Sequence, residues 1–144
     1  MRVSAVGGVP LSRAATMDCP TALALRAWTD GALVPAVGAS GGGIARIEVA
    51  GSYVCRPRNN QRGAKLSEHG RGRAIDISGF ALRDGTVLSV ARHWRDARAG
   101  AILRRLHAAA CGPFGTVLGP DANAAHRDHF HFDTASYRKG SYCR

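Results

Sequence analysis

The segment SEHGRGRAID, residues 67–76, contains two residues capable of chemistry. His69 and Asp76 lie seven positions apart, with glycines and arginines among the residues between them. A loop histidine and a strand-end aspartate that never meet would account for the pair without any chemistry. Imidazole nitrogens and carboxylate oxygens are also common zinc ligands. The pair can therefore belong to a metal site, provided that a third ligand comes from another part of the chain.

The segment HRDHFHFD near the C-terminus offers such a ligand. Alternate side chains of a strand point to opposite faces, which places Phe130 and Phe132 opposite His129, His131 and Asp133. The phenylalanines can enter the core, and imidazoles beside a core strand are costly to bury unless a partner such as a metal compensates. H-x-H is common on ordinary strands, so this segment alone indicates little.

Taken together, His69, Asp76 and one of the strand histidines predict a His-Asp-His zinc site. Three protein ligands and a water are typical of catalytic zinc, whereas structural sites are usually closed by four protein ligands. His126 is close enough in sequence to compete as a ligand, although an exposed loop histidine is the simpler interpretation. Asp133 can hydrogen-bond a ligating histidine or simply be exposed.

The charge of the chain narrows the class of partner. The 144 residues carry a formal net charge of +10, and arginine provides nearly all of the positive charge, since Lys65 and Lys139 are the only lysines. Such a surface attracts nucleic acid, anionic lipid or an acidic polymer such as bacterial cell wall. The arginines are scattered, without a basic helix, zinc-finger spacing or an aromatic RNA-binding signature, so we expect no nucleic-acid partner.

The length predicts one domain, which we place at residues 18–144 after an N-terminal extension at residues 1–17. The apolar runs are far shorter than the roughly 20 residues that cross a bilayer, so we expect no transmembrane segment. The first residues lack the apolar region and the cleavage site of a signal peptide. Any export signal would therefore lie outside this sequence.

Hydrophobic periodicity and turn residues predict an α+β fold with a mainly antiparallel sheet and flanking helices. The first helix is capped by Asp18 or Cys19 and stops at Gly31. Asp84 and Gly85 form the tight turn of a hairpin. The expected elements are helices at 18–31 and 94–112, a strand containing Ile47 and Val49, a long surface loop at 56–72, a hairpin at 73–90 and a strand at 129–133. His93 and His107 are interpreted as ordinary structural residues, and Ser67 as a residue that caps or orients the loop.

The cysteines indicate stabilisation by disulfides. Cys19, Cys55, Cys111 and Cys143 lie far apart and include no C-x-x-C pair, which argues against a zinc ribbon or a redox motif. An even number at wide spacing favours two disulfides and an oxidising compartment over four buried thiols. Three pairings are possible, and we favour Cys19–Cys111, which would join the ends of the two helices, with Cys55–Cys143.

The two chemically capable segments together resemble the signature of the lysostaphin, D-Ala-D-Ala peptidase and sonic hedgehog (LAS-type) metallopeptidases. That signature is S-x-H-x-x-G-x-A-x-D, followed by an acidic residue three positions before the histidine that ends H-x-H. The matching residues are Ser67, His69, Gly72, Ala74, Asp76, Asp128, His129 and His131. From about Cys19 onward, CPTALALRAW, GSYVCR, VLGPDANAAHRDHFHFD and the final YCR also resemble the bacterial extensin-like C-terminal domain. No stretch is proline-rich enough for an extensin rod.

The resemblance implies a LAS-type core and a role for each matched residue. It implies zinc ligands at His69, Asp76 and His131. Asp128 would be the general base that acts on the zinc-bound water, and His129 would steady the oxyanion. Arg56 resembles, more loosely, an arginine that polarises the scissile carbonyl in relatives, although one more solvated arginine is an equal alternative.

The function implied is that of a zinc-dependent peptidoglycan peptidase, an endopeptidase that cleaves cross-links in the periplasm or another exported location. A non-catalytic, zinc-containing wall-binding module is the alternative, and a nucleic-acid-binding domain has only the charge in its favour. D,D-endopeptidases, L,D-endopeptidases and carboxypeptidases share the same core site, so the cleaved bond stays open, as does the oligomeric state.

Overall fold

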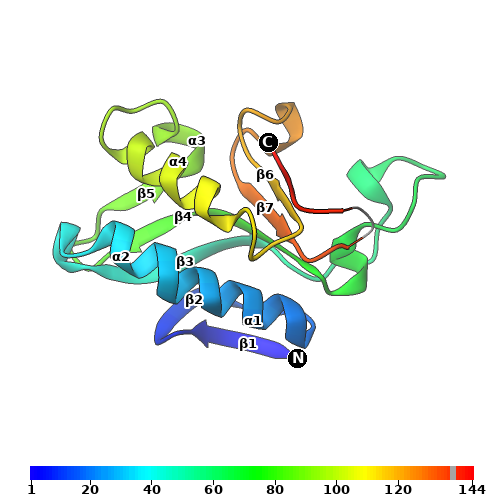
Figure 1. The fold of residues 1–144 in the computed structure, drawn as a ribbon, viewed down its shortest axis with the longest axis horizontal. Coiled ribbons are helices and arrows are strands. Elements are labelled where there is room, and N and C mark those ends of the chain that lie inside the picture. The colour runs from blue at the N-terminus through cyan, green and yellow to red at the C-terminus, as the bar shows by residue number, and fades with distance from the viewer. Residues whose placement is uncertain (137–138) are drawn as a thin grey trace.

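The computed structural model of the protein describes residues 1–136 and 139–144 (Figure 1). Across these residues eight strands form one sheet in the order β1-β2-β3-β4-β7-β6-β8, and β5 pairs with β4 off this path. The strands are β1 (Arg2–Val6), β2 (Val9–Thr16), β3 (Ile44–Gly51), β4 (Ala74–Leu82), β5 (Val87–Ser89), β6 (Thr116–Leu118), β7 (Phe130–Asp133) and β8 (Tyr142–Cys143). The helices are α1 (Cys19–Trp28), α2 (Val34–Val37), α3 (Val90–His93) and α4 (Ala99–Ala110). The remaining helical turns are the π-helix η1 (Thr29–Leu33) and the 3-10 helices η2 (Ser40–Gly42), η3 (Arg58–Asn60), η4 (Glu68–Arg71) and η5 (Ala124–His126).

The sheet is mixed. β2 runs parallel to β3 and β6 runs parallel to β8, while the other pairs are antiparallel. The prediction of an α+β fold with helices beside the sheet is confirmed, but the prediction of a mainly antiparallel sheet is wrong. The physical reason lies in the connections, because a helical crossover such as α1 between β2 and β3 returns the chain in the same direction.

The N-terminal residues belong to the sheet. β1 and β2 form a hairpin whose Val6, Val9 and Leu11 are buried in the core. Leu11 of β2 then pairs with Ile47 of β3. The sheet therefore continues across the domain boundary that we expected after residue 17, and residues 2–16 are part of the fold rather than a separate extension.

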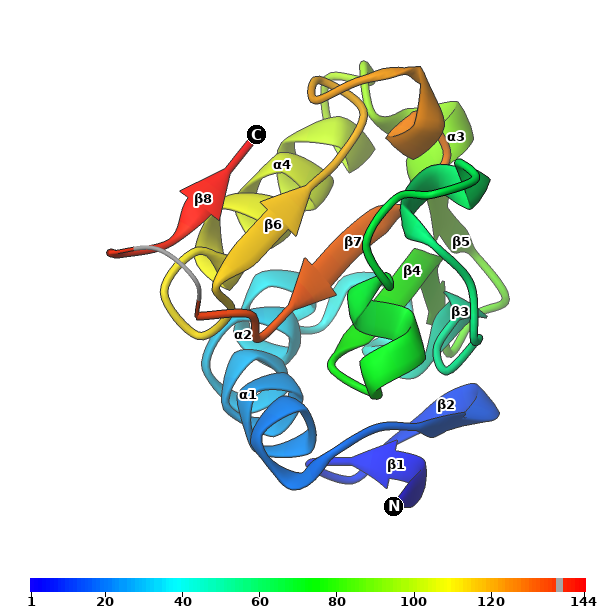
Figure 2. The same ribbon diagram turned by 90° about the vertical axis from the view of Figure 1, so that its right-hand side faces the viewer.

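The helices α1 and α4 cover one face of the sheet (Figure 2). Trp28 at the end of α1 donates its indole N–H to the carbonyl of Leu106 in α4 at 3.0 Å, and its ring contacts Phe80 and Phe132 of the sheet. The alternation of HFHFD is confirmed, because Phe130 and Phe132 are fully buried on this face. His131, which lies between them, therefore points to the opposite face of the sheet.

The first helix starts where the sequence predicts and ends later. Asp18 caps α1 by accepting the N–H of Thr21 at 2.9 Å. The predicted stop at Gly31 is wrong, since Gly31 lies inside the π-turn η1, which carries the chain on into α2. The helical path ends at Gly38, whose φ of 53° suits glycine. The β4–β5 hairpin is confirmed, with Asp84 accepting the N–H of Thr86 at 2.8 Å.

The disulfide joins Cys111 to Cys143, and Cys19 and Cys55 are free and exposed. The predicted pairing and the predicted second bridge are therefore wrong. Parallel pairing of β8 with β6 sets Cys143 beside Val117, close to the turn that leaves α4 at Cys111. Cys19 lies at the start of α1, whereas it is the other end of that helix that contacts α4.

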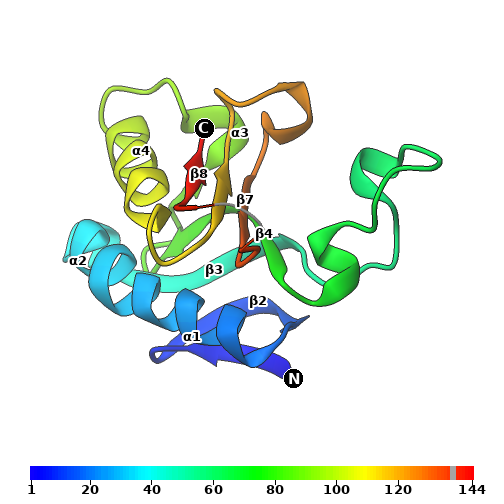
Figure 3. The same cartoon turned by 45° about the vertical axis from the view of Figure 1, so that its right-hand side comes forward.

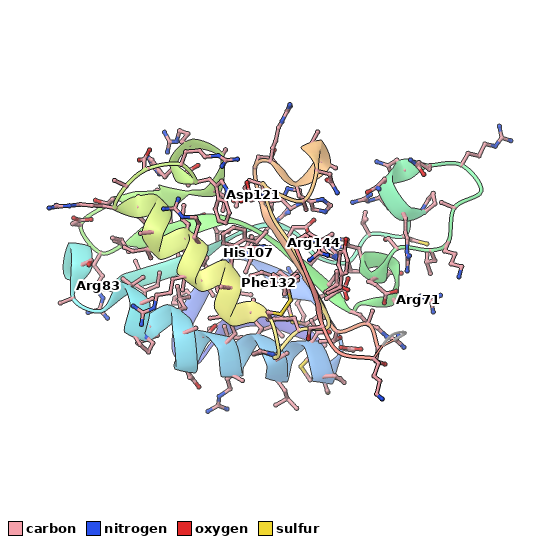
Figure 4. All side chains as sticks on the ribbon, turned by 45° about the horizontal axis from the view of Figure 1, so that its top comes forward. Arg71, Arg83, His107, Asp121, Phe132 and Arg144 are labelled. Carbon is pink, nitrogen blue, oxygen red and sulfur yellow. A yellow bond between two sulfur atoms is a disulfide. The ribbon has the colours of Figure 1, made fainter. Side chains whose placement is uncertain are left out.

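Arginine is spread over the surface. Figure 4 shows Arg71 on the η4 side of the molecule and Arg83 at the far end, beside the turn between β4 and β5. No single helix or strand gathers the positive charge in the part of the chain that the structure describes. In the same residues, no helix is long and apolar enough to span a bilayer.

Candidate metal centre

Three neighbouring elements bring the predicted ligands together. Asp76 of β4 lies directly opposite His131 of β7 in the antiparallel ladder. His69 lies in η4, the turn that precedes β4, within the loop that projects from one end of the sheet (Figure 3). The three side chains are the predicted ligands, and one nitrogen or oxygen atom of each lies within 4.8 Å of the others.

The distances between these atoms fit a zinc ion. His69 Nε2 lies 3.2 Å from both His131 Nδ1 and Asp76 Oδ2, and His131 Nδ1 lies 3.0 Å from Asp76 Oδ1. Ligand atoms placed tetrahedrally at about 2.0–2.1 Å from zinc are separated by about 3.3 Å. Two imidazoles and one carboxylate are also a donor set that zinc accepts. The residues present therefore fit the metal predicted from the sequence.

Hydrogen bonds on the outer nitrogens orient both imidazoles. His69 Nδ1 donates to the carbonyl of Ser52 at 2.6 Å, which leaves Nε2 as the unprotonated nitrogen of the neutral ring. His131 Nε2 donates to Asp133 Oδ2 at 2.8 Å and leaves Nδ1 for a metal. Asp133 is buried, and its other oxygen accepts the N–H of Ala135 at 3.0 Å. Of the two interpretations of Asp133, the structure supports the one in which it bonds a ligating histidine.

The electrostatics of the metal-free site tie metal binding to proton release. Burial disfavours a charged His131, but hydrogen bonds to Asp133 and Asp76 outweigh burial and raise the pKa of His131 to about 9. Burial also opposes the ionised form of Asp76, yet the hydrogen bond from His131 and the close contact with His69 outweigh it and hold the pKa of Asp76 far below its usual range. A metal ion must displace the His131 proton to use Nδ1 as a ligand.

Local backbone features hold the turn that carries His69. Ser67 caps η4 by accepting the N–H of Gly70 at 3.3 Å, which confirms its expected role. Gly72 closes the turn at a φ of 70°, in the left-handed region that favours glycine. Gly51 leaves room for the ligand carboxylate, since a Cβ at this position would lie 3.0 Å from Asp76 Oδ2.

A buried carboxylate ties the same turn to the adjacent loop. Glu68, next to His69, lies within 4.0 Å of the guanidinium groups of Arg58, Arg71 and Arg73. Its side chain is only 8% exposed, so these ion pairs are less screened than pairs on the open surface. Glu68 therefore anchors η3 and the start of β4 around the metal centre.

The triad opens into a cavity of about 430 Å³ between η3 and η5. His126 lines this cavity and is half-buried, rather than an exposed loop histidine. Its Nδ1 donates to Asn123 Oδ1 at 2.7 Å, and its ring lies 5.1 Å from that of His129 and 5.7 Å from that of His131. Burial, together with the neighbouring His131 and His129, lowers the pKa of His126 to about 4, so the ring is neutral at physiological pH.

His129 lies between Asp128 and the triad. His129 Nδ1 donates to Asp128 Oδ1 at 2.7 Å, and this bond lowers the pKa of Asp128. His129 Nε2 lies 3.8 Å from Asp76 Oδ1 and lines the cavity. Asp128 itself is 63% exposed and is not among the residues that line the cavity. The resemblance implies direct action of Asp128 at the metal, whereas the structure connects it to the site through His129.

The other residues singled out from the sequence fall into two groups. Arg56 lines the cavity together with the three residues of the triad. His93 and His107 lie elsewhere: His93 Nδ1 accepts the N–H of Ser89 at 2.9 Å, and the ring of His107 packs against Trp94. The interpretation of both as structural residues is supported.

Sequence reasoning missed two contributors to the site. The carbonyl of Ser52 orients His69, and backbone contacts of this kind carry no side-chain signal. Gly51 makes room for Asp76, and its role depends on the β3–β4 pairing, which the sequence does not show.

The fold and the site define an α+β domain with a His-Asp-His triad suited to a metal ion at the base of an open cavity. The family model described as extensin-like protein C-terminus matches residues 1–144, the whole chain, and the protein therefore belongs to this family. The match confirms the extensin-like resemblance and includes residues 1–17. No curated protein and no solved structure matches the chain.

Proposed function

We propose that this protein is a zinc-dependent peptidase that cleaves peptides of bacterial peptidoglycan, as an endopeptidase acting on cross-links. The observation that carries the proposal is the triad of His69, Asp76 and His131, whose ligand atoms are spaced for zinc and open into a cavity. Three protein ligands leave a coordination position for water, which is the arrangement of catalytic rather than structural zinc.

Bound zinc would act as a Lewis acid and lower the pKa of its water ligand. His129 is placed to remove the proton of the attacking water, because its Nε2 faces the triad. Asp128 accepts the Nδ1–H, fixes the tautomer of His129 and stabilises the charged ring that forms. His129 can then return the proton to the leaving amine. Arg56 lines the cavity, and its guanidinium could stabilise negative charge on the carbonyl oxygen.

The surroundings of the site support a cell-wall substrate. The net charge of +10 suits an anionic polymer such as peptidoglycan with its peptide carboxylates. The Cys111–Cys143 disulfide suits an oxidising compartment, which favours the periplasm. The order of the ligand motif supports kinship with the LAS-type metallopeptidases.

Release of soluble fragments from purified sacculi tests the proposal. We expect the zinc-loaded protein to release muropeptides and the chelator-treated protein to release none. Asp128→Asn and His129→Ala should keep zinc, because neither residue belongs to the triad, and should lose turnover by about 10²–10⁴-fold. His93→Ala is the matched histidine control and should cleave normally. Mass analysis of the products identifies the cleaved bond.

One outcome would reject the enzyme, and another would reject the roles given to Asp128 and His129. If the zinc-loaded protein binds sacculi but releases nothing, the wall-binding module is the correct function. If Asp128→Asn and His129→Ala both cleave at the parent rate, the proton-transfer roles are assigned to the wrong residues.

A further inference from the structure

A second cavity of about 350 Å³ adjoins the metal centre and is lined in part by His69 and Asp76. It shares His69, Asp76 and Arg56 with the first cavity, so the two depressions meet at the triad. Its remaining walls come from β2, from the end of β3 and from the residues that follow β3, including Arg13 and Tyr53. A ligand that crosses the metal centre from the first cavity therefore enters the second.

Arg13 is held in place by the backbone of β3. Its Nε donates to the carbonyl of Val49 at 3.1 Å, and its Nη2 donates to the carbonyl of Ala50. The neighbouring Ser12 hydroxyl accepts the N–H of Val49 at 2.9 Å. A guanidinium has five N–H donors, so these two bonds fix the position of the positive charge and leave donors for a ligand.

The charge of the second cavity is unbalanced. Its lining contains the two arginines Arg13 and Arg56, and its acidic side chain is Asp76, which is committed to the metal triad. Among the described residues, neither arginine forms an ion pair with a carboxylate. Charge-assisted hydrogen bonds from a guanidinium to a carboxylate are strong and bidentate, so an anionic ligand group complements this cavity.

We propose that the second cavity is a subsite for a carboxylate of the peptide substrate, with Arg13 as its main recognition residue and Arg56 as a second contact. The inference rests on the proposed function, because it names the part of a peptide substrate that extends beyond the metal centre. It also gives the N-terminal hairpin a role in recognition, since Arg13 belongs to β2. The carboxylate can be the C-terminus of a peptide or an acidic side chain.

Nuclear magnetic resonance of the zinc-loaded, ¹⁵N-labelled protein tests the subsite without any cleavage. The probes are N-acetyl-D-alanine, which has a terminal carboxylate, N-acetyl-glutamic acid α-amide, which has a side-chain carboxylate, and N-acetyl-D-alanine amide, which has none. We expect a carboxylate probe to shift the amide signals of Ala14, Gly51 and Ser52. The probe that does so more strongly identifies the source of the carboxylate.

Substitutions separate recognition by Arg13 from binding of a carboxylate to the zinc ion, which the variants retain. Arg13→Gln should weaken binding of the preferred carboxylate probe about tenfold or more and leave the amide probe unchanged. Arg13→Lys should keep part of the affinity because it keeps the charge. Within the described part of the chain, the Arg56 side chain forms no hydrogen bond to a β3 carbonyl, in contrast to Arg13, so Arg56→Gln should produce a smaller loss. Arg26→Gln, on the surface of α1, is the matched arginine control.

The outcomes distinguish the subsite from the proposed activity. Equal affinity of wild type and Arg13→Gln for both carboxylate probes overturns the inference, even if sacculi are cleaved. Arg13-dependent binding of a carboxylate in a protein that releases nothing from sacculi supports the subsite and rejects the peptidase. Arg13→Gln is not used if its amide signal of Gly51 is shifted before any probe is added, or if it loses zinc. In that case the affinity of Arg56→Gln for the carboxylate probes decides whether the subsite exists.

Discussion

The walls of the metal cavity are built in two different ways. On one side β4 and β7 place Asp76 opposite His131, and their neighbours Ile75 and Phe132 are fully buried. Both ligand residues have a further contact besides each other: His131 bonds Asp133, and Asp76 contacts His69. The ladder therefore sets the positions of the metal ligands before any ion binds.

The other wall is the loop between β3 and η4. Tyr53 and Val54 are 53% and 44% exposed, and the loop is tied at its base by the bridge between Pro57 and Leu66. Figures 1 and 3 show this loop projecting from the end of the molecule. Arg56 belongs to this wall. Under the proposed function, we expect a division of labour, in which the ladder would hold the metal and the open loop would contact the substrate.

Removal of a ladder ligand should have the largest effect. His131→Ala deletes one ligand and leaves two buried carboxylates, Asp76 and Asp133, without their shared partner, so we expect equimolar zinc binding to be lost. Metal analysis after gel filtration measures the zinc content. His93→Ala is the control and should retain zinc. Undiminished zinc in His131→Ala would show that the metal lies outside the triad.

Replacing a disulfide cysteine should lower the stability of the protein much more than replacing a free cysteine in the loop. Cys143→Ser opens a bridge with a sequence separation of 32, and we expect unfolding free energy to fall by about 3–4 kcal/mol. Cys55→Ser, in the loop wall, changes an exposed free thiol and should shift stability by less than about 0.5 kcal/mol. Urea titration of both variants provides the measurement, and equal losses would contradict the contrast between the two regions.

The partner of a ligand should matter less than the ligand. Asp133→Asn removes the acceptor charge that orients His131, and we expect zinc affinity to fall by about 10–100-fold. Competition with a chromophoric chelator measures this affinity. Asp128→Asn is the matched control, because Asp128 contacts His129 outside the triad and should leave zinc affinity unchanged. A similar loss in both variants would remove the special role of Asp133.

A further expected effect is a change of stability with pH in the metal-free protein. The folded pKa of His131 is about 9, above the usual 6.5, so its contribution is complete below pH 6.5 and is lost as pH rises toward 9. The folded pKa of His126 is about 4, so its contribution is lost as pH falls from 6.5 toward 4. Melting temperature should therefore peak near pH 6.5 in the presence of chelator.

Zinc should move that optimum upward, since the metal requires unprotonated His131. A thermal melt across the same pH range with saturating zinc measures the shift, and His131→Ala should lose the alkaline decline of the chelated protein. An optimum that stays in place when zinc is added would mean that the metal does not compete with the His131 proton.

The sequence was most informative where local geometry decides the outcome. Strict alternation in HFHFD was enough to send Phe130 and Phe132 into the core and His131 to the other face. Motif order was enough to select His69 and Asp76 as its partners. These features need only a strand and a turn, and both are short-range properties of the chain.

The sequence was least informative where distant segments pair. Cys143 meets Cys111 because β8 runs parallel to β6, and nothing in the local sequence encodes that pairing. The parallel β2–β3 contact that brings in the N-terminal hairpin is likewise a long-range choice. The role of Asp128 at the metal was inferred from the motif alone. Its bond to His129 depends on the backbone turn before β7, which the motif does not specify.

X-ray absorption spectroscopy at the zinc edge of the zinc-loaded protein tests the central claim most directly. The triad predicts nitrogen and oxygen ligands at about 2.0–2.1 Å, with imidazole scattering from two histidines that falls to one in His131→Ala. A sulfur shell at about 2.3 Å would instead place the metal on Cys19 or Cys55, and an imidazole signal unchanged by His131→Ala would exclude the triad as the zinc site.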